Sequence, residues 1–376
     1  METERTNSNL PGADRPHVVH LETGRHVYGG AQQVLYLTER LPALGVRSTL
    51  VCAAGGEMAT KARAAGTEVV ELPTIGDADP SITWRFAALL RRLRPDLVHI
   101  HSRRGADVWG GLGARLAGVP AIMSRRNDNR EAWLALKLKY PLYRHVVAVA
   151  QGIKDVLVEQ GIPGSDITVV HSAIDPARFQ HPRPRAELAT TFSLDPGQPI
   201  LGIAAQLIDR KGHVLLFDAL HKLSSRHPAV QLIVFGRGPL SDSLPAEAAA
   251  RGLQSRVCFA GFRQDLGQWI GALDLLVHPA YTEGLANVCL QAGAAGVATI
   301  GTRVGGIPEA IADGRTGLLV PVGDADALAA AIDRLLTDVD LRQRLGAAGP
   351  AHVESDFTPP IMAAGNRAVY RRVIGR

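Results

Sequence analysis

Cysteine is scarce in this chain, and long apolar runs are absent from its sequence. The three cysteines, Cys52, Cys258 and Cys289, lie far apart, each in an apolar run. This arrangement favours neither a disulfide framework nor a zinc site, and it predicts a reducing, cytosolic compartment. No run approaches the roughly eighteen apolar residues that a membrane-spanning helix needs. Residues 1–15 are polar and lack the apolar segment of a signal peptide, so we expect a disordered tail there.

A strong excess of one charge is also missing. Lys and Arg total 41 and Asp and Glu total 36, which gives a formal net charge of +5. So small an excess favours a solvated surface over a nucleic-acid-binding face. It is compatible with peripheral contact with the anionic cytoplasmic face of an inner membrane. The sequence therefore predicts a cytoplasmic protein with no nucleic-acid partner, and it leaves peripheral membrane contact open.

Short apolar runs alternate with segments of helical length from Pro16 onward. The 376 residues are enough for two domains. Near-continuous runs of Val, Ile and Leu, each followed by a helix-length segment, are typical of a parallel sheet covered on both faces. The runs are 17–21, 49–52, 68–72, 97–100, 121–123, 146–150 and 167–170 in the first half, and 200–204, 231–235, 257–259, 275–277, 298–300 and 318–320 in the second.

A break rich in proline separates the two halves, over 179–197. Its composition predicts a turn-rich linker. We therefore predict an α/β fold with two Rossmann-like, doubly wound domains, the first over 16–180 and the second over 198–356, joined by a linker over 181–197. Ligands bind such sheets outside the carboxyl ends of the strands, so the active site is expected between the domains. The last segment, 357–376, has a helical pattern that begins with two prolines.

The stretch from His278 to Ala310 carries the strongest functional signal. A short apolar run is followed there by the charged Glu283, the turn residue Gly284 and a helix of small residues. The first-turn N–H groups of a helix in that position can hold an anion. The pattern therefore predicts a site for a phosphorylated ligand.

This stretch resembles the nucleotide-sugar site of the retaining glycosyltransferases of family 4, which have the GT-B fold. The matching residues are Glu283, Gly284, Gly293, Gly296 and the run 305–309. The resemblance covers nearly the whole chain, from about His17 to the last helix. It implies two domains that face each other across a cleft, and a final helix, 361–374, that crosses back to pack on the first domain.

The resemblance also implies roles for the residues of this stretch. Glu283 would hold the sugar hydroxyls of the donor, while backbone N–H groups meet its sugar and phosphate. Those N–H groups belong to Gly284, Leu285, Ala286, Asn287 and Val288. The family has a second carboxylate facing the ribose, and this chain has Gln291 in its place. An amide can still accept from one hydroxyl and donate to another, so each weakened bond costs about 1 kcal/mol.

The segment 205–212 resembles the part of the family's site that neutralises the donor diphosphate. Lys211, followed by glycine, matches the family's lysine, but the family's arginine is Gln206 here. The loss of a charge-assisted bond to diphosphate costs about 1.5 to 3 kcal/mol unless another cation replaces it. Arg210, or an arginine of the first domain, could supply that cation.

Glycine turns resemble the remaining donor contacts. Gly29 and Gly30 lie at the first βα turn, where a glycine pair of the family lies across the cleft from the donor. Gly236, and Gly261 with Phe262, resemble the places where the base and ribose of the nucleotide pass. Glycine lets the backbone approach a phosphate closely. Each of these turns could equally be an ordinary one if it stood alone.

Two Ser-Arg-Arg triplets each follow a predicted strand of the first domain. Strand carboxyl ends point into the cleft, so Arg103, Arg104, Arg125 and Arg126 could converge there. Arginine binds phosphate or carboxylate bidentately, which predicts an anionic acceptor with His101 beside it. The alternative is a pair of solvated loops.

Two alternating histidines invite a metal interpretation, because His99 and His101 share one face of a strand. His278, near Glu283, adds to it. No carboxylate or cysteine stands at ligand spacing beside the pair in the sequence. Ordinary cleft or core histidines are therefore favoured, and no metal is predicted.

The resemblance as a whole implies a retaining, hexosyltransferase-like enzyme. It would move a sugar from a nucleotide-diphosphate sugar to a hydroxyl of an anionic glycan or glycolipid, such as a lipopolysaccharide core intermediate. Glu283 and Lys211 would be the catalytic residues, with no cofactor or metal, because Lys211 and backbone dipoles would stabilise the leaving diphosphate. Two alternatives stay open. Gln206 and Gln291 would fit a catalytically silent nucleotide-sugar-binding protein, and the fold also serves other enzymes such as nucleotide-sugar epimerases and phosphorylases.

Overall fold

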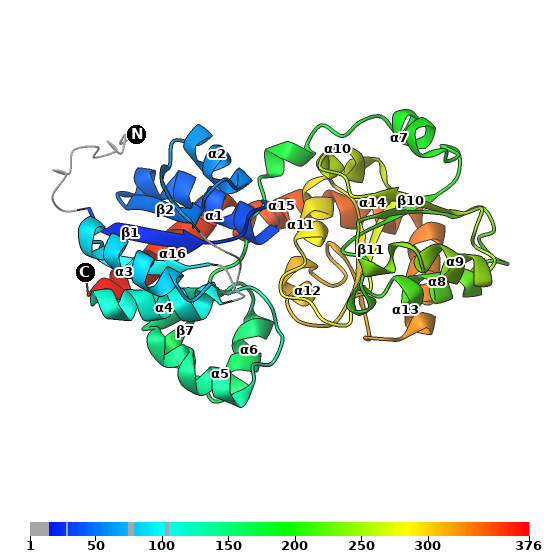
Figure 1. Ribbon diagram of the computed structural model, residues 1–376. Helices are drawn as coiled ribbons and strands as arrows, with labels where there is room; N and C mark the ends of the chain where they lie inside the picture. Colours follow the sequence, from blue (N-terminus) through cyan, green and yellow to red (C-terminus); the bar gives the residue numbers. More distant parts are fainter. Residues whose placement is uncertain (1–14, 28, 74–78, 102–104, 376) are drawn as a thin grey trace, which may run out of the picture.

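Two parallel β-sheets, each the centre of one α/β domain, form the framework of the molecule (Figure 1). The structure is a computed structural model that describes residues 15–27, 29–73, 79–101 and 105–375. Within these residues one sheet has seven strands and the other has six. The predicted fold class, with two doubly wound parallel sheets, is confirmed.

The first sheet has the order β3-β2-β1-β4-β5-β6-β7, and every neighbouring pair is parallel. Its strands are β1 (His17–Glu22), β2 (Arg47–Ala53), β3 (Glu68–Leu72), β4 (Leu97–Ile100), β5 (Ala121–Arg125), β6 (His145–Ala148) and β7 (Ile167–Val169). Its helices are α1 (Gly29–Arg40), α2 (Glu57–Ala64), α3 (Ile82–Leu93), α4 (Ala106–Ala117), α5 (Trp133–Leu138) and α6 (Gln151–Glu159). The central strands β1 and β4 are buried along their whole length, and their Val, Leu and Ile side chains lie beside the buried histidines His20 and His99.

The second sheet has the order β10-β9-β8-β11-β12-β13 and is also parallel throughout. Its strands are β8 (Ile200–Ala204), β9 (Gln231–Phe235), β10 (Val257–Gly261), β11 (Leu275–His278), β12 (Thr299–Thr302) and β13 (Gly317–Val320). The helices that follow the first domain are α7 (Arg185–Phe192), α8 (His213–Lys222), α9 (Leu244–Ala250), α10 (Leu266–Trp269), α11 (Asn287–Ala294), α12 (Ile307–Ala310), α13 (Ala325–Thr337), α14 (Val339–Ala347), α15 (Gly349–Asp356) and α16 (Pro359–Ile374).

The carboxyl ends of the two sheets face each other, and the loops that leave them touch. The loop after β5 contacts the loop after β11, where the Glu283 N–H donates to Asp128 Oδ2 over 3.2 Å. The loop after β6 contacts the start of α12, where the Gln151 N–H donates to the Glu309 carboxylate over 2.8 Å. Side chains that follow these strands therefore share one region between the domains.

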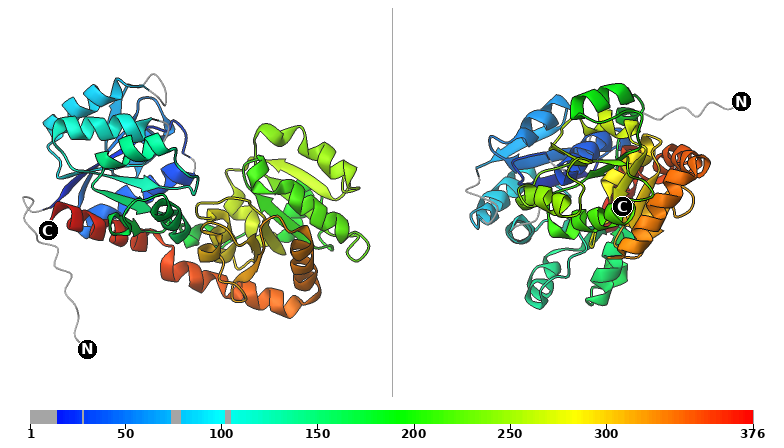
Figure 2. Two further views of the ribbon diagram at one scale, coloured as in Figure 1. Left: turned by 90° about the horizontal axis from the view of Figure 1, so that it is seen from below. Right: turned by 90° about the vertical axis from the view of Figure 1, so that its right-hand side faces the viewer.

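The C-terminal helices tie the two domains together. α15 packs against α11 in the second domain, and α16 runs on to pack against α1 and the short helix η1 (Leu41–Leu44) in the first (Figure 2). Met362, Ala363 and Tyr370 of α16 share a buried cluster with side chains of β1 and α1. At 16 residues α16 is a long helix of this chain, yet none of the helices in the described residues has the length and apolarity needed to span a bilayer.

The segment between the domains departs from the sequence prediction. A turn-rich linker was expected over 181–197, but α7 lies within it. The helix buries Leu188 and Phe192, and the Phe192 ring packs edge-on against Trp269 with ring centroids 5.3 Å apart. Eight residues are too few to show a clear helical period, so the helix depends on these tertiary contacts.

Replacement of Tyr370 tests the contribution of α16 to stability. Its side chain is fully buried and its hydroxyl lies 2.7 Å from His99 Nδ1. We expect Tyr370→Ala to lower the free energy of unfolding by about 3 to 5 kcal/mol, because the site loses an aromatic ring and a hydrogen bond. Urea denaturation measures the change. The neighbouring, exposed Arg371→Ala is the control, expected to change stability by less than about 0.5 kcal/mol. Similar losses in the two variants would contradict the prediction.

Candidate functional site

An ion pair between Lys211 and Glu283 lies at the centre of the site. Lys211 Nζ donates to Glu283 Oε2 over 2.6 Å, and His278 Nε2 lies 2.7 Å from the same oxygen. The other carboxylate oxygen accepts the Gly284 N–H over 3.1 Å. The side chains of Lys211 and Glu283 are only 10% and 14% exposed. The two residues predicted to be catalytic therefore contact each other, although 72 positions separate them in the sequence.

The environment of Glu283 keeps its carboxylate ionised. Burial acts to raise the pKa of Glu283, since a buried carboxylate loses its water. The hydrogen bond and charge of His278 oppose that effect, as does the charge of Lys211, and together they hold the pKa well below its usual range. Glu283 is thus an anion at neutral pH and balances the buried charge of Lys211.

A glycine places Lys211 in this position. Lys211 ends the short helix η5 (Asp209–Lys211), which follows β8, and Gly212 caps it with a φ of 72°. A Cβ atom on residue 212 would lie 2.0 Å from the carbonyl oxygen of Pro279. Only glycine allows both this conformation and this approach. The Lys-Gly pair thus joins the β8 loop to the β11 loop that carries Glu283.

The start of α11 offers backbone donors beside the ion pair. Of the five N–H groups predicted to meet the donor, that of Gly284 donates to Glu283 and that of Asn287 donates to the Leu285 carbonyl. In the part of the chain that the structure describes, the N–H groups of Leu285, Ala286 and Val288 have no acceptor. No acidic side chain occupies the first turn of α11. Three donors and the positive end of a helix are therefore available to an anion.

A pocket of about 690 Å³ adjoins α11. It is lined by Ala204, Ala205, Gln206, Phe235, Gly236, Arg237, Gly238, Ser241, Phe262, Arg263, Leu266, Val288 and Gln291. Five of these are predicted donor-binding residues, namely Gln206, Gly236, Phe262, Val288 and Gln291. Gly261 is not among the lining residues, but its carbonyl accepts the Gly236 N–H over 2.8 Å. The glycine turns and the two unexpected glutamines therefore meet at one pocket.

Sequence reasoning missed two arginines of this pocket. The Arg237 guanidinium lies 4.8 Å from the centre of the Phe262 ring, a cation–π contact. Arg263 donates to both carboxylate oxygens of Asp265, over 2.8 and 2.7 Å. Arg237 stands between two glycines of a recognised turn, so its place in that turn was the available signal. Arg210 does not line the pocket, and its carbonyl accepts the Tyr281 N–H over 2.8 Å.

The first domain closes the site from the other side. A Cβ atom on Gly29 would lie 3.9 Å from the Asn287 side chain, and one on Gly30 would lie 3.5 Å from the Arg126 side chain. Gly29 therefore faces the start of α11 across the interface, whereas Gly30 lies beside Arg126 of its own domain. Gly284 in turn allows the closest approach between the loops, because a Cβ there would lie 2.3 Å from the Arg126 carbonyl oxygen.

The predicted arginine cluster is only partly present. Arg126 lies in the cleft, with a guanidinium nitrogen 3.4 Å from His101 Nδ1. Burial lowers the pKa of Arg126 to about 10, so it stays charged at neutral pH. The prediction for Arg125 is wrong, because that side chain is 1% exposed and pairs with Glu131 inside the first domain. Arg103 and Arg104 lie outside the described residues.

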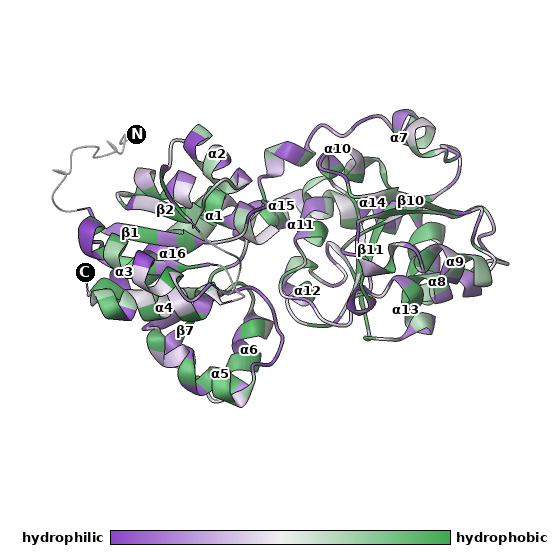
Figure 3. Ribbon diagram, viewed as in Figure 1, coloured by the Kyte–Doolittle hydropathy of each residue, from purple (hydrophilic) through white to green (hydrophobic). Residues whose placement is uncertain are grey.

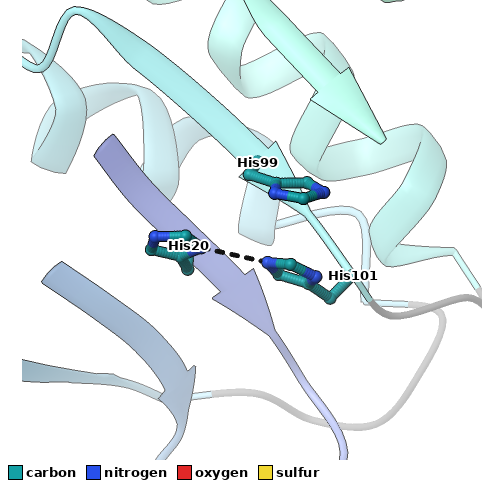
Figure 4. A group of neighbouring side chains, drawn as sticks. All are labelled: His20, His99 and His101. Carbon is teal, nitrogen blue, oxygen red and sulfur yellow. Dashed lines mark hydrogen bonds between the residues drawn. The ribbon is translucent and has the colours of Figure 1, made fainter. Parts of the chain in front are cut away.

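His101 belongs to a buried group of three histidines with His20 and His99 (Figure 4). His20 Nδ1 lies 3.0 Å from His101 Nε2, and His99 bonds to Tyr370 and Ser124 through its two ring nitrogens. Burial lowers the pKa of all three, that of His20 to about 3, so they are neutral at pH 7.

The histidine group has the closeness of a metal site but not its surroundings. Candidate ligand atoms of the three rings lie within 4.8 Å of one another. Both nitrogens of His99 already have partners, and the charge of Arg126 lies 3.4 Å from His101. A divalent cation would have to displace those bonds and tolerate that charge. The arrangement fits a neutral hydrogen-bonded group better than a metal centre.

Glu309 bridges the domains beside the site. Both of its carboxylate oxygens lie 2.8 Å from the Gln151 nitrogen at the start of α6, and His171 Nε2 lies 2.8 Å from one of them. A carboxylate is well placed at a helix N-terminus, where N–H groups lack intrahelical acceptors. The sequence motif contains Glu309 but shows no sign of this contact.

Family models match both domains of the chain. The model described as Glycosyltransferase Family 4 matches residues 27–178, and the model described as Glycosyl transferases group 1 matches residues 185–352. The chain is 29% identical over 353 residues to the lipopolysaccharide core biosynthesis mannosyltransferase LpsB of Rhizobium meliloti, covering 88% of this chain and 94% of that protein. It is 34% identical over 311 residues to a GDP-mannose-dependent monoacylated alpha-(1-6)-phosphatidylinositol monomannoside mannosyltransferase of Corynebacterium glutamicum, covering 78% and 79%.

Solved structures share the fold at low sequence identity. A glycosyltransferase of Rickettsia africae superposes with a TM-score of 0.84 at 20% identity, over 96% of this chain and 99% of that one. HepE of Anabaena, solved in complex with UDP and glucose, has a TM-score of 0.83 at 19% identity, over 95% and 100%. These likenesses extend over both domains.

Removal of the Glu283 charge should destabilise the free protein. Glu283→Gln leaves the Lys211 charge buried without its carboxylate, and we expect a loss of roughly 3 kcal/mol or more in the free energy of unfolding. Urea unfolding at neutral pH measures it. The double variant Lys211→Met/Glu283→Gln removes both charges and should recover part of the loss. An E283Q variant as stable as the wild type would show that the pair does not hold the two loops together.

The buried histidines predict a loss of stability in mild acid. The folded-state pKa of His20, about 3, lies below the ordinary 6.5, so the unfolded chain binds the proton first as the pH falls. This contribution is complete above about pH 6.5 and declines toward pH 3 by about 1.4 kcal/mol per pH unit. Urea unfolding at several pH values gives the slope. His20→Gln should reduce it by about one proton, whereas His26→Gln, at an exposed residue, should not. An unchanged slope in H20Q would refute this assignment.

Proposed function

The chain belongs to the GT-B glycosyltransferases of group 1 and family 4, and from that premise we propose that it transfers a sugar from a nucleotide-diphosphate sugar to a hydroxyl of a cell-envelope glycan or glycolipid. Its class as a glycosyltransferase follows from the family. The observation that carries the proposed donor site is the buried Lys211–Glu283 pair beside the start of α11. There, among the described residues, the N–H groups of Leu285, Ala286 and Val288 have no acceptor. The donor, the acceptor and the stereochemistry are parts of the proposal.

The donor would lie between the pocket and the ion pair. Its nucleoside would occupy the pocket of about 690 Å³, against Gly236, Phe262 and Gln291. Its diphosphate would meet Lys211 and the start of α11, and Glu283 would accept hydrogen bonds from the sugar hydroxyls. Gln206 lines the same pocket, while Gly29 and Gly30 approach from the first domain.

The proposed reaction retains the configuration of the sugar. The bond between the anomeric carbon and the diphosphate oxygen breaks, and the acceptor oxygen forms a bond to that carbon on the same face. The acceptor proton passes to the departing phosphate oxygen. Lys211 and the N–H groups of α11 stabilise the developing negative charge, a role that pre-oriented donors in a buried site fill well. In this proposal Lys211 and the helix dipole take the part that a metal ion has in other transferases.

The relatives favour an anionic, lipid-linked acceptor. One is named for lipopolysaccharide core biosynthesis and another for transfer to a phosphatidylinositol mannoside. Arg126 and His101, together in the cleft of the first domain, are the described residues that we assign to the acceptor. A charged guanidinium there suits a phosphate or carboxylate group. Peripheral contact with the cytoplasmic face of the inner membrane belongs to this proposal.

Two classes of donor nucleotide, guanosine and uridine diphosphates, are both compatible with the proposed site. Relatives are named as GDP-mannose-dependent, whereas structural neighbours were solved with UDP or UDP-glucose. The pocket contains backbone groups, two arginines and Phe262, which suit an aromatic base of either kind. Binding measurements therefore have to decide the base.

A catalytically silent nucleotide-sugar-binding protein is the second candidate. The observation in its favour is that Gln206 and Gln291, both neutral, line the pocket where the family has charged side chains. The buried Lys211–Glu283 pair favours the enzyme. Incubation with donor and a lipopolysaccharide core or phosphatidylinositol mannoside acceptor distinguishes the two, because only the enzyme forms product. Proton NMR of the product gives its anomeric configuration, and an inverted linkage would exclude the retaining mechanism.

Donor binding should stabilise the protein through Lys211. In a thermal-shift panel of UDP, GDP, ADP and their sugar conjugates, we expect one nucleotide series to raise Tm. At a hundredfold excess over Kd the stabilisation is about 2.7 kcal/mol. Lys211→Ala should weaken diphosphate binding by roughly ten- to a hundredfold, because a charge-assisted bond is lost.

The matched control is Lys222→Ala, a lysine exposed at the end of α8. It should bind as the wild type does. If no nucleotide raises Tm at millimolar concentration, the proposed donor site is wrong. An equal loss in both lysine variants would show that the effect is not local to the site.

A further inference from the structure

Helix α5 is apolar, yet none of its side chains is buried. Trp133 is 66% exposed, Leu134 is 58% exposed and Leu138 is 64% exposed. With Lys137 these residues occupy positions i, i+1, i+4 and i+5, which share one face of a helix. Figure 3 shows the apolar colouring of α5 at the outer edge of the first domain. We refer to Trp133, Leu134, Lys137 and Leu138 as the α5 surface.

Buried charges hold α5 in this position. Glu131, just before the helix, pairs with Arg125 and with Lys139, whose Nζ lies 2.7 Å from Glu131 and 3.1 Å from Asp107. Arg125 and Lys139 are buried, at 1% and 5% exposure. Ionic groups thus lie inside the domain while large apolar side chains lie outside it. Burial of charges and exposure of large apolar side chains both cost free energy when the helix contacts only water. The α5 surface is therefore a candidate for contact with an apolar partner.

Basic side chains are exposed on and beside the α5 surface. Between residues 125 and 160 the exposed charged side chains are Arg130, Lys137 and Arg144 against Asp155 and Glu159, because Arg125 and Lys139 are buried. Lys137 lies on the α5 surface, with its Nζ 4.6 Å from the centre of the Trp133 ring, and Arg144 is exposed just beyond the helix. Tryptophan and leucine beside lysine are typical of helices that lie at the boundary between lipid headgroups and acyl chains. Basic residues complement the negative surface potential of such a membrane.

The small size of the α5 surface argues against a second copy of the chain. α5 has six residues, and three of them provide the large exposed apolar side chains. A stable protein interface needs about 800 Å² per partner, in a patch packed as closely as a protein interior. A bilayer requires no such shape match, because lipid chains adapt to inserted side chains.

The position of α5 in the chain connects this surface to the cleft. The connection from β5 to β6 contributes residues to both. It begins with Arg126 and Asp128 at the domain interface and continues into α5. Glu131 ties the same connection to the end of α6, through the Gln160 side chain. The segment that would contact the membrane through the α5 surface is therefore the same β5–β6 connection that carries Arg126 on the acceptor side of the site.

We propose that the α5 surface docks the enzyme on an anionic lipid bilayer, with Trp133, Leu134 and Leu138 inserted among the lipids and Lys137 at the headgroups. This inference rests on the proposed function, in which the acceptor is lipid-linked. It assigns a specific surface to the membrane contact. The attachment is reversible and weakens at high salt, because part of it is electrostatic.

Vesicle binding tests the proposal. Full-length protein is sedimented with vesicles of equimolar phosphatidylglycerol and phosphatidylethanolamine, and with vesicles of phosphatidylcholine alone. The wild type should bind the anionic vesicles more tightly. The triple variant Trp133→Ser/Leu134→Ser/Leu138→Ser should bind at least about tenfold more weakly, because the full insertion of even one such side chain contributes roughly a factor of ten. Trp84→Ser on α3 is the matched control, because Trp84 is also 66% exposed, and it should bind as the wild type does.

Quenching of tryptophan fluorescence by lipid tests whether Trp133 contacts the bilayer, independently of the triple variant. In Trp84→Phe the exposed tryptophan of the described residues is Trp133, and brominated phosphatidylglycerol should quench its fluorescence. In Trp133→Phe quenching should be largely lost. The proposal is overturned if the wild type does not bind, if the triple variant binds equally, or if Trp84→Ser loses as much. It is also overturned if light scattering detects a dimer that the triple variant abolishes.

The nucleotide thermal shift separates this inference from the proposed function. The triple variant should keep the wild-type shift, because α5 lies outside the donor pocket. Vesicle binding without any nucleotide shift would contradict the proposed donor site and leave the docking surface intact. A nucleotide shift without vesicle binding would leave the donor site intact and remove the docking surface.

Discussion

A buried positive charge without a counter-charge is strongly destabilising, and the carboxylate of Glu283 supplies the counter-charge for Lys211. The pair joins the loop after β8 to the loop after β11, two strands that lie next to each other in the middle of the second sheet. Gly212 makes the approach possible, and His278 contacts the same carboxylate oxygen from the end of β11. The start of α11 and the wall of the pocket are both reached from these loops. The geometry of the candidate site therefore depends on one ion pair between neighbouring strand ends.

Much of this arrangement could be predicted from the sequence. A parallel strand that is buried on both faces is mostly apolar, so most of the strands appear in the sequence as short runs rich in Val, Ile and Leu. In such sheets the functional loops follow the strands, which predicts a site at the strand ends. The family resemblance then identified Lys211 and Glu283 as residues of two of these loops. The glycines that resemble the family's turns, Gly29, Gly236 and Gly284, lie at close approaches between backbone segments or loops, where a side chain would not fit or would meet a neighbour.

Other features depend on neighbours that are distant in the sequence or on orientation along a loop. Arg125 and Arg126 are adjacent and identical in type, yet one points into the domain toward Glu131 and the other into the cleft toward His101. A residue-by-residue motif cannot distinguish them, because the alternation of side chains at a strand end decides which one is buried. Helix α7 was not predicted, because its eight residues are too few to show a helical period in the sequence. The role of Glu309 requires the first domain to be in place, since its partners belong to α6 and to the loop after β7.

The distribution of charge explains how a site with two glutamines can still hold a diphosphate in the proposed reaction. Without ligand, Lys211 is balanced by Glu283 and Arg263 by Asp265, so the cations of the second domain are partly neutralised. A diphosphate that meets Lys211 competes with Glu283 for the same ammonium group. Sugar hydroxyls offer Glu283 new hydrogen-bond donors at the same time. The carboxylate can therefore exchange the Lys211 ammonium group for these hydroxyls and keep its hydrogen bonds. Release of Lys211 and capture of the sugar would then be one coupled event, and the neutral Gln206 would lower affinity for the diphosphate without breaking that coupling.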